Sequence, residues 1–337
     1  MTSLDQPNAA GPPQSPAADR DGSDASKPTP ESLPNLLLAG IGRAGSSSLF
    51  WYLSQHPDIC ASSVKEPRYF LPLSEADEDA TGSLGSLDGY TRLFDRCSAE
   101  PFRMEATPHY FNGGGRLVDG IRRSLPDPHV ILTLRDPVTR TWSIYRAAMS
   151  ILQIPKDLSF ERYIDRSEQL YLSAAKRTPD NRPYWSIRGA VYADYLPAWF
   201  ERFADDRLRV QYFEDIVADP PGVVAETCRW LGLDDSGVSG FRFSVENRTL
   251  GFRNKTLHRV ALIANRQGLL RERRRLKAPL RALYQALNMG SQQEKMSDDA
   301  RARLKAIFAE PNQRLASLLA GRGYRRLPSW LADGDDN

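Results

Sequence analysis

Cysteines, long apolar runs and excess charge are all scarce in this chain of 337 residues. Its three cysteines, Cys60, Cys97 and Cys228, lie far apart and are odd in number, so the sequence predicts neither a disulfide framework nor a zinc cluster. A reducing compartment fits this cysteine usage. No apolar run reaches the roughly 18 residues that span a bilayer, and the N-terminus lacks the pattern of a signal peptide. We therefore expect a cytoplasmic protein without a transmembrane segment.

The formal net charge of +3 is too small to argue for nucleic acid by itself. A content of 26% charged and 41% hydrophobic residues is ordinary for a globular protein, and the length allows a sizeable core. We expect one α/β domain over residues 35–331. Residues 1–34 have almost no bulky apolar side chains and are expected to form a disordered tail, and residues 332–337 a frayed acidic tail.

The most informative stretch runs from Leu36 to Pro57, where an apolar run of strand length enters a turn with three glycines and continues as an apolar-rich helix. Gly40 and Gly45 have the glycine spacing of a P-loop, and without Cβ atoms they let backbone N–H groups close around an anion. The three serines at 46–48 open the helix, whose positive dipole end favours a phosphate. The pattern predicts a phosphate-binding loop, and the alternative is a Gly/Ser-rich turn without a ligand.

This loop differs from the loop of nucleoside triphosphatases at one informative position. After Gly45, where those proteins carry the lysine that reaches the β- and γ-phosphates, the chain has Ser46. The only cation in the turn is Arg43. We therefore do not expect this loop to hold a triphosphate with magnesium.

Strand and helix patterns alternate along the rest of the chain. Apolar runs predict strands at 102–106, 129–134 and 208–213, and helical patterns follow at 137–150, 188–203, 221–231 and from 297. This alternation predicts an α/β fold with a mostly parallel sheet flanked by helices. Arg135 then lies at the carboxyl end of a strand, with Ser143 about two turns into the next helix, and ligands bind at that edge of open sheets.

A basic segment lies between the sheet region and the final helix. Within a helical insertion expected at 256–296, Arg266 to Arg281 carry seven Lys or Arg against the single acid Glu272. Leucines through this segment favour a helix that is packed on one side and solvated on its basic face. The alternative is a patch for an anionic acceptor, a membrane surface or nucleic acid. On the preferred interpretation no nucleic acid partner is expected, and peripheral membrane contact through 266–281 stays open.

Five motifs occur in one order along the chain. They read G-I-G-R-A-G-S-S-S at 40–48, K-E-P-R-Y-F at 65–70, E-A-T-P-H-Y-F at 105–111, L-R-D-P-V-T-R-T-W-S at 134–143 and Q-Y-F-E-D at 211–215. In this order and spacing the chain resembles the sulfotransferases that use 3′-phosphoadenosine 5′-phosphosulfate (PAPS), particularly the branch of the heparan sulfate sulfotransferases and their bacterial relatives. The resemblance covers about Leu36 to Leu233 and implies a P-loop-like fold.

The resemblance also implies a donor site. The 5′-phosphosulfate would lie on the glycine loop, at Arg43, Gly45, Ser46, Ser47 and Ser48. The 3′-phosphate would lie between Arg135 and Ser143, where a guanidinium fork and a hydroxyl can share one anion. Without a ligand, Arg135 would instead cap the sheet edge and Ser143 would bond its own backbone. Further donor contacts are expected from Arg188, Arg253 and Lys255.

The catalytic base that the resemblance implies is Glu66, because an acceptor hydroxyl is a poor nucleophile until a carboxylate takes its proton. Lys65 would help to hold the transferring sulfonate. Many relatives carry lysine where this chain has Arg43, and a guanidinium can stabilise charge on the leaving phosphate but hardly donates a proton. His109 is the next candidate base. A further departure is Ala106, where the glycosaminoglycan enzymes tend to carry lysine.

These observations predict metal-independent transfer of a sulfonate from PAPS to a hydroxyl or amine of a small molecule or carbohydrate. Two alternatives stay open at this point. One is a nucleotide or small-molecule kinase of P-loop-like fold, which would need magnesium. The other is a non-catalytic binding protein that uses the basic segment. The sequence names neither the acceptor nor the oligomeric state.

Overall fold

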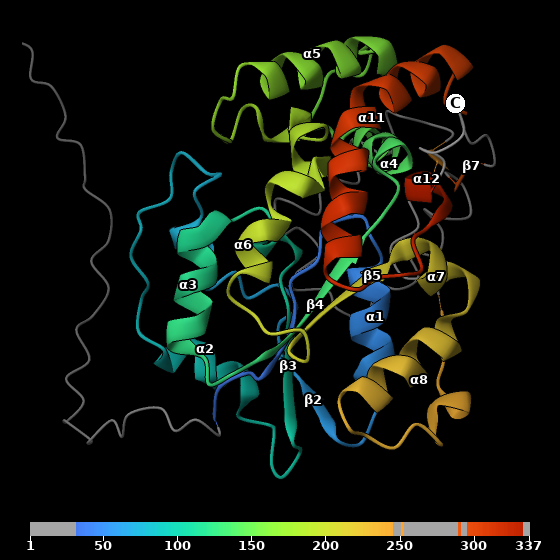
Figure 1. Cartoon of the computed structure of the whole chain (residues 1–337). Coiled ribbons are helices and arrows are strands. Elements are labelled where there is room, and N and C mark those ends of the chain that lie inside the picture. Colours follow the sequence, from blue (N-terminus) through green and yellow to red (C-terminus); the bar gives the residue numbers. More distant parts are fainter. Residues whose placement is uncertain (1–31, 245–250, 253–288, 291–294, 333–337) are drawn as a thin grey trace, which may run out of the picture.

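The computed structural model describes residues 32–244, 251–252, 289–290 and 295–332. Its centre is a five-stranded sheet flanked by helices on both faces (Figure 1). All neighbouring strands of this sheet are parallel, in the order β2-β3-β1-β4-β5. The strands are β1 (Leu36–Leu38), β2 (Ile59–Ala61), β3 (Phe102–Ala106), β4 (His129–Leu134) and β5 (Leu208–Tyr212). The predicted α/β fold with a parallel sheet is confirmed.

The sheet is buried on both faces, which explains why its strands have continuous apolar runs. Alternate residues of a strand point to opposite faces, so Leu36 and Leu38 join one core cluster while Leu37 joins the other. In the parallel register Leu38 lies opposite both Ala106 of β3 and Ile131 of β4. The carboxyl ends of the three central strands are therefore aligned at one edge.

Helices form the outer layers of the domain. The face with Leu36 and Leu38 is covered by α1 (Ser46–Leu53) and α8 (Pro220–Trp230). The core cluster on the other face draws on α3 (Gly114–Ser124), α4 (Pro137–Ser150), α5 (Phe160–Leu172), α6 (Leu196–Phe200) and α11 (Asp298–Gly321). Figure 1 shows α3 and α6 on the side of the sheet away from α8. The short helices are α2 (Asp88–Thr91), α7 (Phe213–Ala218) and α12 (Ser329–Ala332), and β6 (Gly251–Phe252) pairs with β7 (Met289–Gly290).

The single helix predicted over 188–203 is wrong. The segment contains two 3-10 turns, η6 (Arg188–Ala190) and η7 (Tyr192–Asp194), before α6. Pro197 lies in the first turn of α6, where a missing N–H costs nothing, so it begins this helix instead of kinking a longer one. The apolar spacing still marks the core side correctly, because Trp199 is fully buried and its indole N–H donates to the carbonyl of Phe111 at 3.1 Å.

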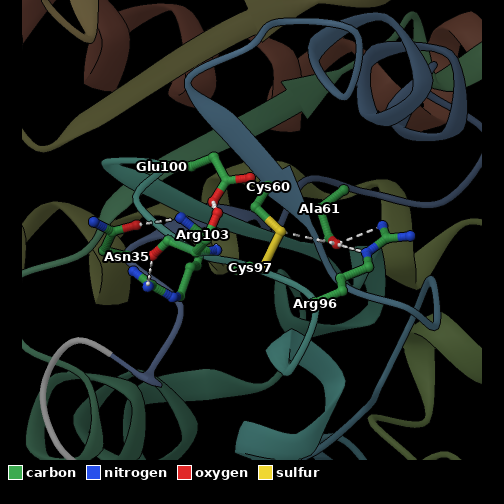
Figure 2. The surroundings of a disulfide bond; sticks show 8 residues. Asn35, Cys60, Ala61, Arg96, Cys97, Glu100 and Arg103 are labelled. Carbon is green, nitrogen blue, oxygen red and sulfur yellow. Dashed lines mark hydrogen bonds between the residues drawn. A yellow bond between two sulfur atoms is a disulfide. The ribbon is translucent and has the colours of Figure 1, made fainter.

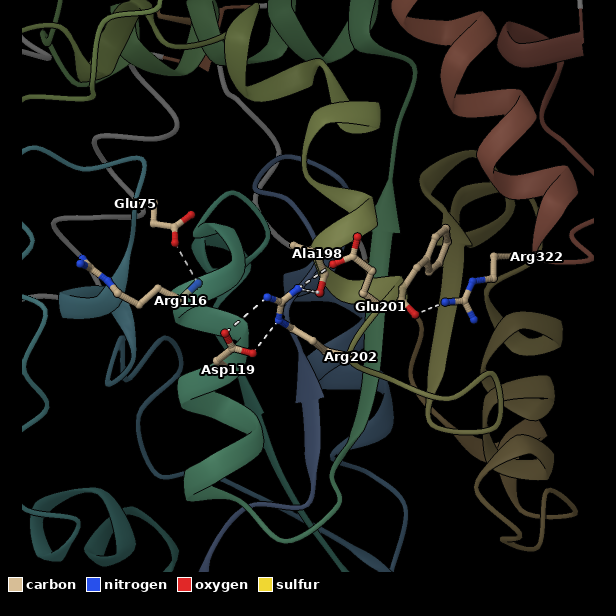
Figure 3. A network of polar contacts seen from close by, with 8 residues as sticks. Glu75, Arg116, Asp119, Ala198, Glu201, Arg202 and Arg322 are labelled. Atoms are coloured by element: carbon tan, nitrogen blue, oxygen red, sulfur yellow. Dashed lines mark hydrogen bonds and ion pairs between the residues drawn. The ribbon is translucent and has the colours of Figure 1, made fainter.

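Polar contacts join α3, α6 and α11 across this face, as Figure 3 shows. Arg202, just after α6, donates to Asp119 of α3 at 2.6 Å and to the Ala198 carbonyl at 3.3 Å. Arg322, just after α11, donates to the Phe200 carbonyl. Partly exposed ion pairs of this kind contribute about 0–1 kcal/mol each. The buried apolar surface therefore carries most of the stability here, and the pairs fix how the helices align.

A disulfide joins Cys60 of β2 to Cys97, which follows the 3-10 turn η3 (Arg92–Phe94), with the two Cα atoms 5.7 Å apart. Arg96 reinforces the junction with bonds of 3.2 and 2.7 Å to the Ala61 carbonyl (Figure 2). The expectation that the sequence forms no disulfide is wrong for this pair. Its members are 37 residues apart, and only the fold brings the second one back to β2.

The disulfide also removes one argument for a cytoplasmic location, because disulfides persist mainly in oxidising compartments. The cytoplasmic location stays a prediction. Cys228 is buried and takes no part in a disulfide.

Several predicted segments lie outside the described residues. They are 1–31 of the N-terminal tail, 253–288 of the basic insertion with its arginine-rich stretch 266–281, and 333–337 of the acidic tail. At the start of the described chain, Leu33 is buried against the core. Within the described ranges, no helix is both long and apolar enough to cross a membrane.

The glycine loop offers a matched test of this packing. A Cβ added at Gly40 would lie 1.9 Å from the backbone nitrogen of Thr133 in β4, whereas one at Gly42 would meet nothing within 4 Å. We expect Gly40→Ala to lower the free energy of unfolding by about 1–3 kcal/mol or more, because the clash is with backbone. Gly42→Ala should stay within about 0.5 kcal/mol of the wild type. Urea unfolding curves that coincide for the two variants would contradict the close contact between the loop and β4.

Candidate functional site

The predicted site residues gather where the strands end. The glycine loop follows β1, the Lys65–Arg68 segment follows β2, and Arg135 follows β4. The segment from Thr107 to Phe111 follows β3, which lies between β2 and β1. The fifth motif, 211–215, spans the end of β5, so the fold brings all five motifs to the edge at which ligands bind in open parallel sheets.

The glycine loop enters α1 through two residues in the left-handed region, Arg43 at φ 72° and Gly45 at φ 84°. Gly45 precedes α1, whose first residues are the three serines. In the described part of the chain, no side chain caps this helix start and its first turn holds no acidic residue. The first N–H groups of a helix have no partner within it, so this end of α1 suits an anion.

Two arginines hold the outside of the loop. Arg135 donates through Nη1 to the carbonyl of Arg43, and Arg140 donates through Nε to the carbonyl of Gly42, both at 3.0 Å. In a trans peptide the N–H points away from the carbonyl of the same unit. The arginines therefore turn two loop carbonyls outward and the corresponding N–H groups away from themselves.

The predicted pair Arg135 and Ser143 is joined through Arg43. The Nε of Arg43 donates to the hydroxyl of Ser143 at 3.0 Å, while its carbonyl accepts from Arg135. Arg135 also donates to the hydroxyl of Thr139 at 3.3 Å. The structure thus brings together three predicted donor-binding residues from two separate motifs.

Positive charge accumulates around this loop. Burial, followed by the like charges of Arg140 and Arg146, lowers the pKa of Arg43 from its ordinary value. Burial also lowers the pKa of Arg135, partly offset by the nearby carboxylate of Glu214. Guanidinium groups stay protonated in proteins, so the direction of both shifts indicates that burial and neighbouring positive charge disfavour this cluster. The negative charge of a bound phosphate would offset both effects.

The residues that orient Arg135 were not predicted from the sequence. The carbonyl of Arg135 accepts from the hydroxyl of Tyr192 at 2.8 Å, and the guanidinium of Arg135 lies over the ring of Phe213, 4.2 Å from the centroid. Asp136 caps α4 and its own N–H donates to Glu214 at 3.0 Å. The motif at 211–215 contained Phe213 and Glu214, but their role depends on the pairing of β5 with β4.

Arg140 is a second residue that the sequence analysis missed. It is 6% exposed, and its described hydrogen bonds go to the carbonyls of Gly42 and Ser186. Arg140 belongs to the motif at 134–143, but the sequence does not show that its side chain is buried and bonds to the glycine loop.

Glu66 lies between two cations. Its Oε1 accepts from Lys65 at 2.9 Å, and its Oε2 accepts from Arg68 at 3.2 Å. Burial alone would raise the pKa of Glu66, but the hydrogen bonds and charges of Lys65 and then Arg68 outweigh it and hold that pKa below its ordinary value. Glu66 is therefore an ionised, partly buried carboxylate at neutral pH.

The backbone around Glu66 is strained. Glu66 and Arg68, on either side of Pro67, have φ values of 63° and 62°. A residue before proline normally adopts an extended conformation, and left-handed residues other than glycine cost about 1–3 kcal/mol each. Such strain persists only where surrounding contacts hold it, and it is common at functional sites.

His109 lies close enough to Glu66 for the charges of the two groups to interact. Burial, then the charge of Arg177, lowers the pKa of His109 to about 4, so the ring is neutral at pH 7. Its Nδ1 is buried and has no hydrogen-bond partner among the described residues. A neutral ring can accept a proton, so His109 remains a second candidate base.

Three further residues were predicted to contact the sulfonate donor, namely Arg188, Arg253 and Lys255. Arg188 donates to the carbonyl of Tyr171 at 3.5 Å and lies 5.9 Å from the ring centroid of Trp185. Those contacts do not join it to the glycine loop. Arg253 and Lys255 lie outside the described residues.

The chain is similar to known proteins in sequence and in fold. Residues 83–237 match the model of the Sulfotransferase family. The chain carries a sulfotransferase-family domain. The matched range includes the segments after β3, β4 and β5, whereas the glycine loop precedes it, so the loop is assigned here from its geometry.

Two animal proteins are among the relatives of this chain. Heparan sulfate glucosamine 3-O-sulfotransferase 6 of Mus musculus is 29% identical over 211 residues, which cover 62% of this chain and 55% of that protein. Bifunctional heparan sulfate N-deacetylase/N-sulfotransferase 1 of Caenorhabditis briggsae is 22% identical over 90% of this chain and 32% of its own length. The chain thus spans about half the length of the mouse protein and a third of the nematode one.

A solved structure resembles the whole domain. The sulfotransferase from Alicyclobacillus acidocaldarius has a TM-score of 0.61 at 23% identity, and the match covers 88% of this chain and 98% of that one. At this identity the likeness concerns the fold, and it supports the P-loop-like architecture of the sulfotransferase-family domain.

The buried ring of His109 predicts a specific acid sensitivity. Between pH 6.5 and about 4 the unfolded chain takes up a proton at this histidine while the folded protein does not, so the free energy of unfolding falls as pH drops through this interval. His109→Gln lacks the proton site, so we expect a smaller loss of stability between pH 7 and pH 4.5 than in the wild type. The measurement is thermal unfolding of both proteins across this range. Parallel curves would show that His109 titrates normally.

Proposed function

We propose that this protein transfers a sulfonate group from PAPS to a hydroxyl or amine of an acceptor by in-line displacement without a metal. The observation that carries this proposal is the pair Arg135 and Arg140, bonded to the carbonyls of a glycine loop that has Ser46 in place of a lysine. A loop without that lysine suits a triphosphate chain poorly, whereas Arg43, Arg135 and Ser143 lie together beside it and can hold a separate phosphate.

The residues present fit this donor. Arg43, Gly45 and the three serines that open α1 would hold the 5′-phosphosulfate through the helix start and their hydroxyls. Arg135 and Ser143 would hold the 3′-phosphate, and both already contact Arg43. When bound, PAPS supplies the sulfonate, and 3′,5′-ADP is the leaving group. The arginine cluster would stabilise the charge that develops on this group.

Glu66 would take the proton from the acceptor. Its carboxylate is ionised, and its strained turn fixes the direction in which it points. Lys65, whose side chain is 17% exposed, would move from the carboxylate to the anionic sulfonate. That exchange would release Glu66 from one of its cations and make it more basic, which favours proton removal.

The acceptor class is supported by the names of the relatives, which act on heparan sulfate. We propose a carbohydrate or a small hydroxylated molecule as the acceptor. Ala106, at the end of β3, is part of the hydrophobic core. Unlike a lysine at this position, it offers no positive charge to an acidic sugar.

The second candidate function is a nucleotide or small-molecule kinase, which the parallel sheet and the glycine spacing of the loop also support. A kinase would require magnesium with a triphosphate, whereas the proposed reaction would proceed in excess EDTA. Turnover that is lost on chelation and restored by magnesium would favour the kinase.

The donor site predicts binding of 3′,5′-ADP. A ligand that binds only the folded state adds RT ln(1 + [L]/Kd), or about 2.7 kcal/mol at 100-fold excess over Kd, so the melting temperature should rise. Arg135→Ala should abolish most of this rise and Ser143→Ala should weaken it, with the exposed Arg123→Ala of α3 as a matched arginine control. If 5′-AMP stabilises the wild type as well as 3′,5′-ADP does, the assignment of a 3′-phosphate site to Arg135 and Ser143 is wrong.

The base assignment predicts a separation of chemistry from binding. Glu66→Gln keeps the size and hydrogen-bonding capacity of the side chain but loses the basic oxygen, so kcat should fall by about 100-fold while donor affinity is unchanged. Arg43→Ala should lower both, and Arg43→Lys should keep partial activity if the role is electrostatic. Formation of 3′,5′-ADP from PAPS, with heparan sulfate and small hydroxylated compounds as acceptors, measures this. Near wild-type turnover of Glu66→Gln would transfer the base role to His109.

A further inference from the structure

The strained turn at Glu66, Pro67 and Arg68 is held by the chain that leaves β3. The N–H of Glu66 donates to the Ala106 carbonyl at 2.9 Å. The N–H of Arg68 donates to the hydroxyl of Thr107 at 3.3 Å. Pro67 has no N–H, so these are the two backbone donors that the turn itself can offer. The geometry of Glu66 therefore depends on what fixes the Thr107 side chain.

Glu105 fixes that side chain. Its Oε2 accepts from the Thr107 hydroxyl at 2.8 Å, and Thr107 is 1% exposed. A hydroxyl has one hydrogen, and once it is given to Glu105 the lone pairs of the oxygen remain for the N–H of Arg68. The carboxylate thus sets the direction of the whole chain of bonds from Glu105 through Thr107 to the turn.

A second contact of Glu105 leads to the residue that follows the turn. Its Oε1 accepts from the hydroxyl of Tyr90 at 2.8 Å, and the ring of Tyr90 stacks on Tyr69 with centroids 4.5 Å apart. Tyr69 directly follows Arg68. One carboxylate therefore holds both the backbone of the turn and the aromatic side chain that comes after it.

Burying the carboxyl group of Glu105 costs folding free energy. Glu105 is 0% exposed, and burial raises its pKa to about 7 even though the hydroxyls of Thr107 and Tyr90 favour the ionised form. A buried carboxyl is expensive unless it is hydrogen-bonded, and an apolar residue would fill the same space at lower cost. Both oxygens of Glu105 are used on the turn that carries Glu66.

We propose that Glu105 is a positioning residue, which through Thr107 and Tyr90 holds the Glu66–Arg68 turn in its left-handed conformation and so aims the Glu66 carboxylate. The structural part of this statement concerns the turn alone. Its catalytic consequence rests on the proposed function, in which Glu66 takes the proton from the acceptor.

The test is hydrogen–deuterium exchange of the full chain, followed by mass spectrometry of peptides covering 65–70. Thr107→Val keeps the shape of the side chain but removes the hydroxyl, so exchange in this segment should become about 10-fold faster, which corresponds to the loss of one buried hydrogen bond. Thr107→Ser retains the hydroxyl and should restore the wild-type rate. Glu105→Met, whose thioether is only a weak acceptor, should resemble Thr107→Val, and Glu105→Gln, with one acceptor oxygen left, should fall between.

Peptides covering 208–212 in β5 report whether a variant has opened globally, and their exchange should not change. Equal exchange of 65–70 in the wild type and in both Thr107→Val and Glu105→Met overturns the proposal. So does faster exchange in Thr107→Val that Thr107→Ser fails to reverse. A wild type that 3′,5′-ADP does not stabilise would refute the donor site instead, and would leave the exchange result standing.

Discussion

The hydrogen bonds from two arginines, one buried and one partly buried, to the carbonyls of the glycine loop are the interaction on which the site depends. Arg135 and Arg140 come from the end of β4 and from α4, yet they fix a loop that follows β1. They determine which way the loop peptides face, and they concentrate positive charge beside the start of α1. The parallel register of β1 and β4 makes this possible, because it aligns the ends of the two strands.

The same edge of the sheet carries a second arrangement with different physics. Around the loop, cations are crowded and would be relieved by an anion. Around Glu66, a carboxylate is balanced between Lys65 and Arg68 in a backbone conformation that β3 holds in place. The crowded arginines lie at the ends of β1 and β4, and the strained Glu66 turn follows β2, with β3 between β2 and β1. This division suits a reaction in which one group leaves with negative charge and another loses a proton.

The sequence predicted the sheet and most of the site because those features are encoded locally. The apolar run at 129–134, the glycine spacing before α1 and the motif around Arg135 each carry their meaning within about ten residues. The disulfide, the inward turn of Arg140 and the role of Glu105 depend on contacts between distant segments, which no local pattern reports. The apolar spacing over 188–203 marked the buried side correctly. The prediction of one long helix failed because two 3-10 turns come first and a new helix begins around Pro197.

The assignment of the donor site is tested by a crystal structure of the protein with 3′,5′-ADP. We expect the 5′-phosphate on the N–H groups of residues 45–48 and the 3′-phosphate between Arg135 and Ser143, with Arg43 between the two groups. We also expect the Glu66–Arg68 turn to keep its left-handed conformation. A nucleotide bound away from the arginine cluster, or a 3′-phosphate that points to solvent, would contradict the assignment.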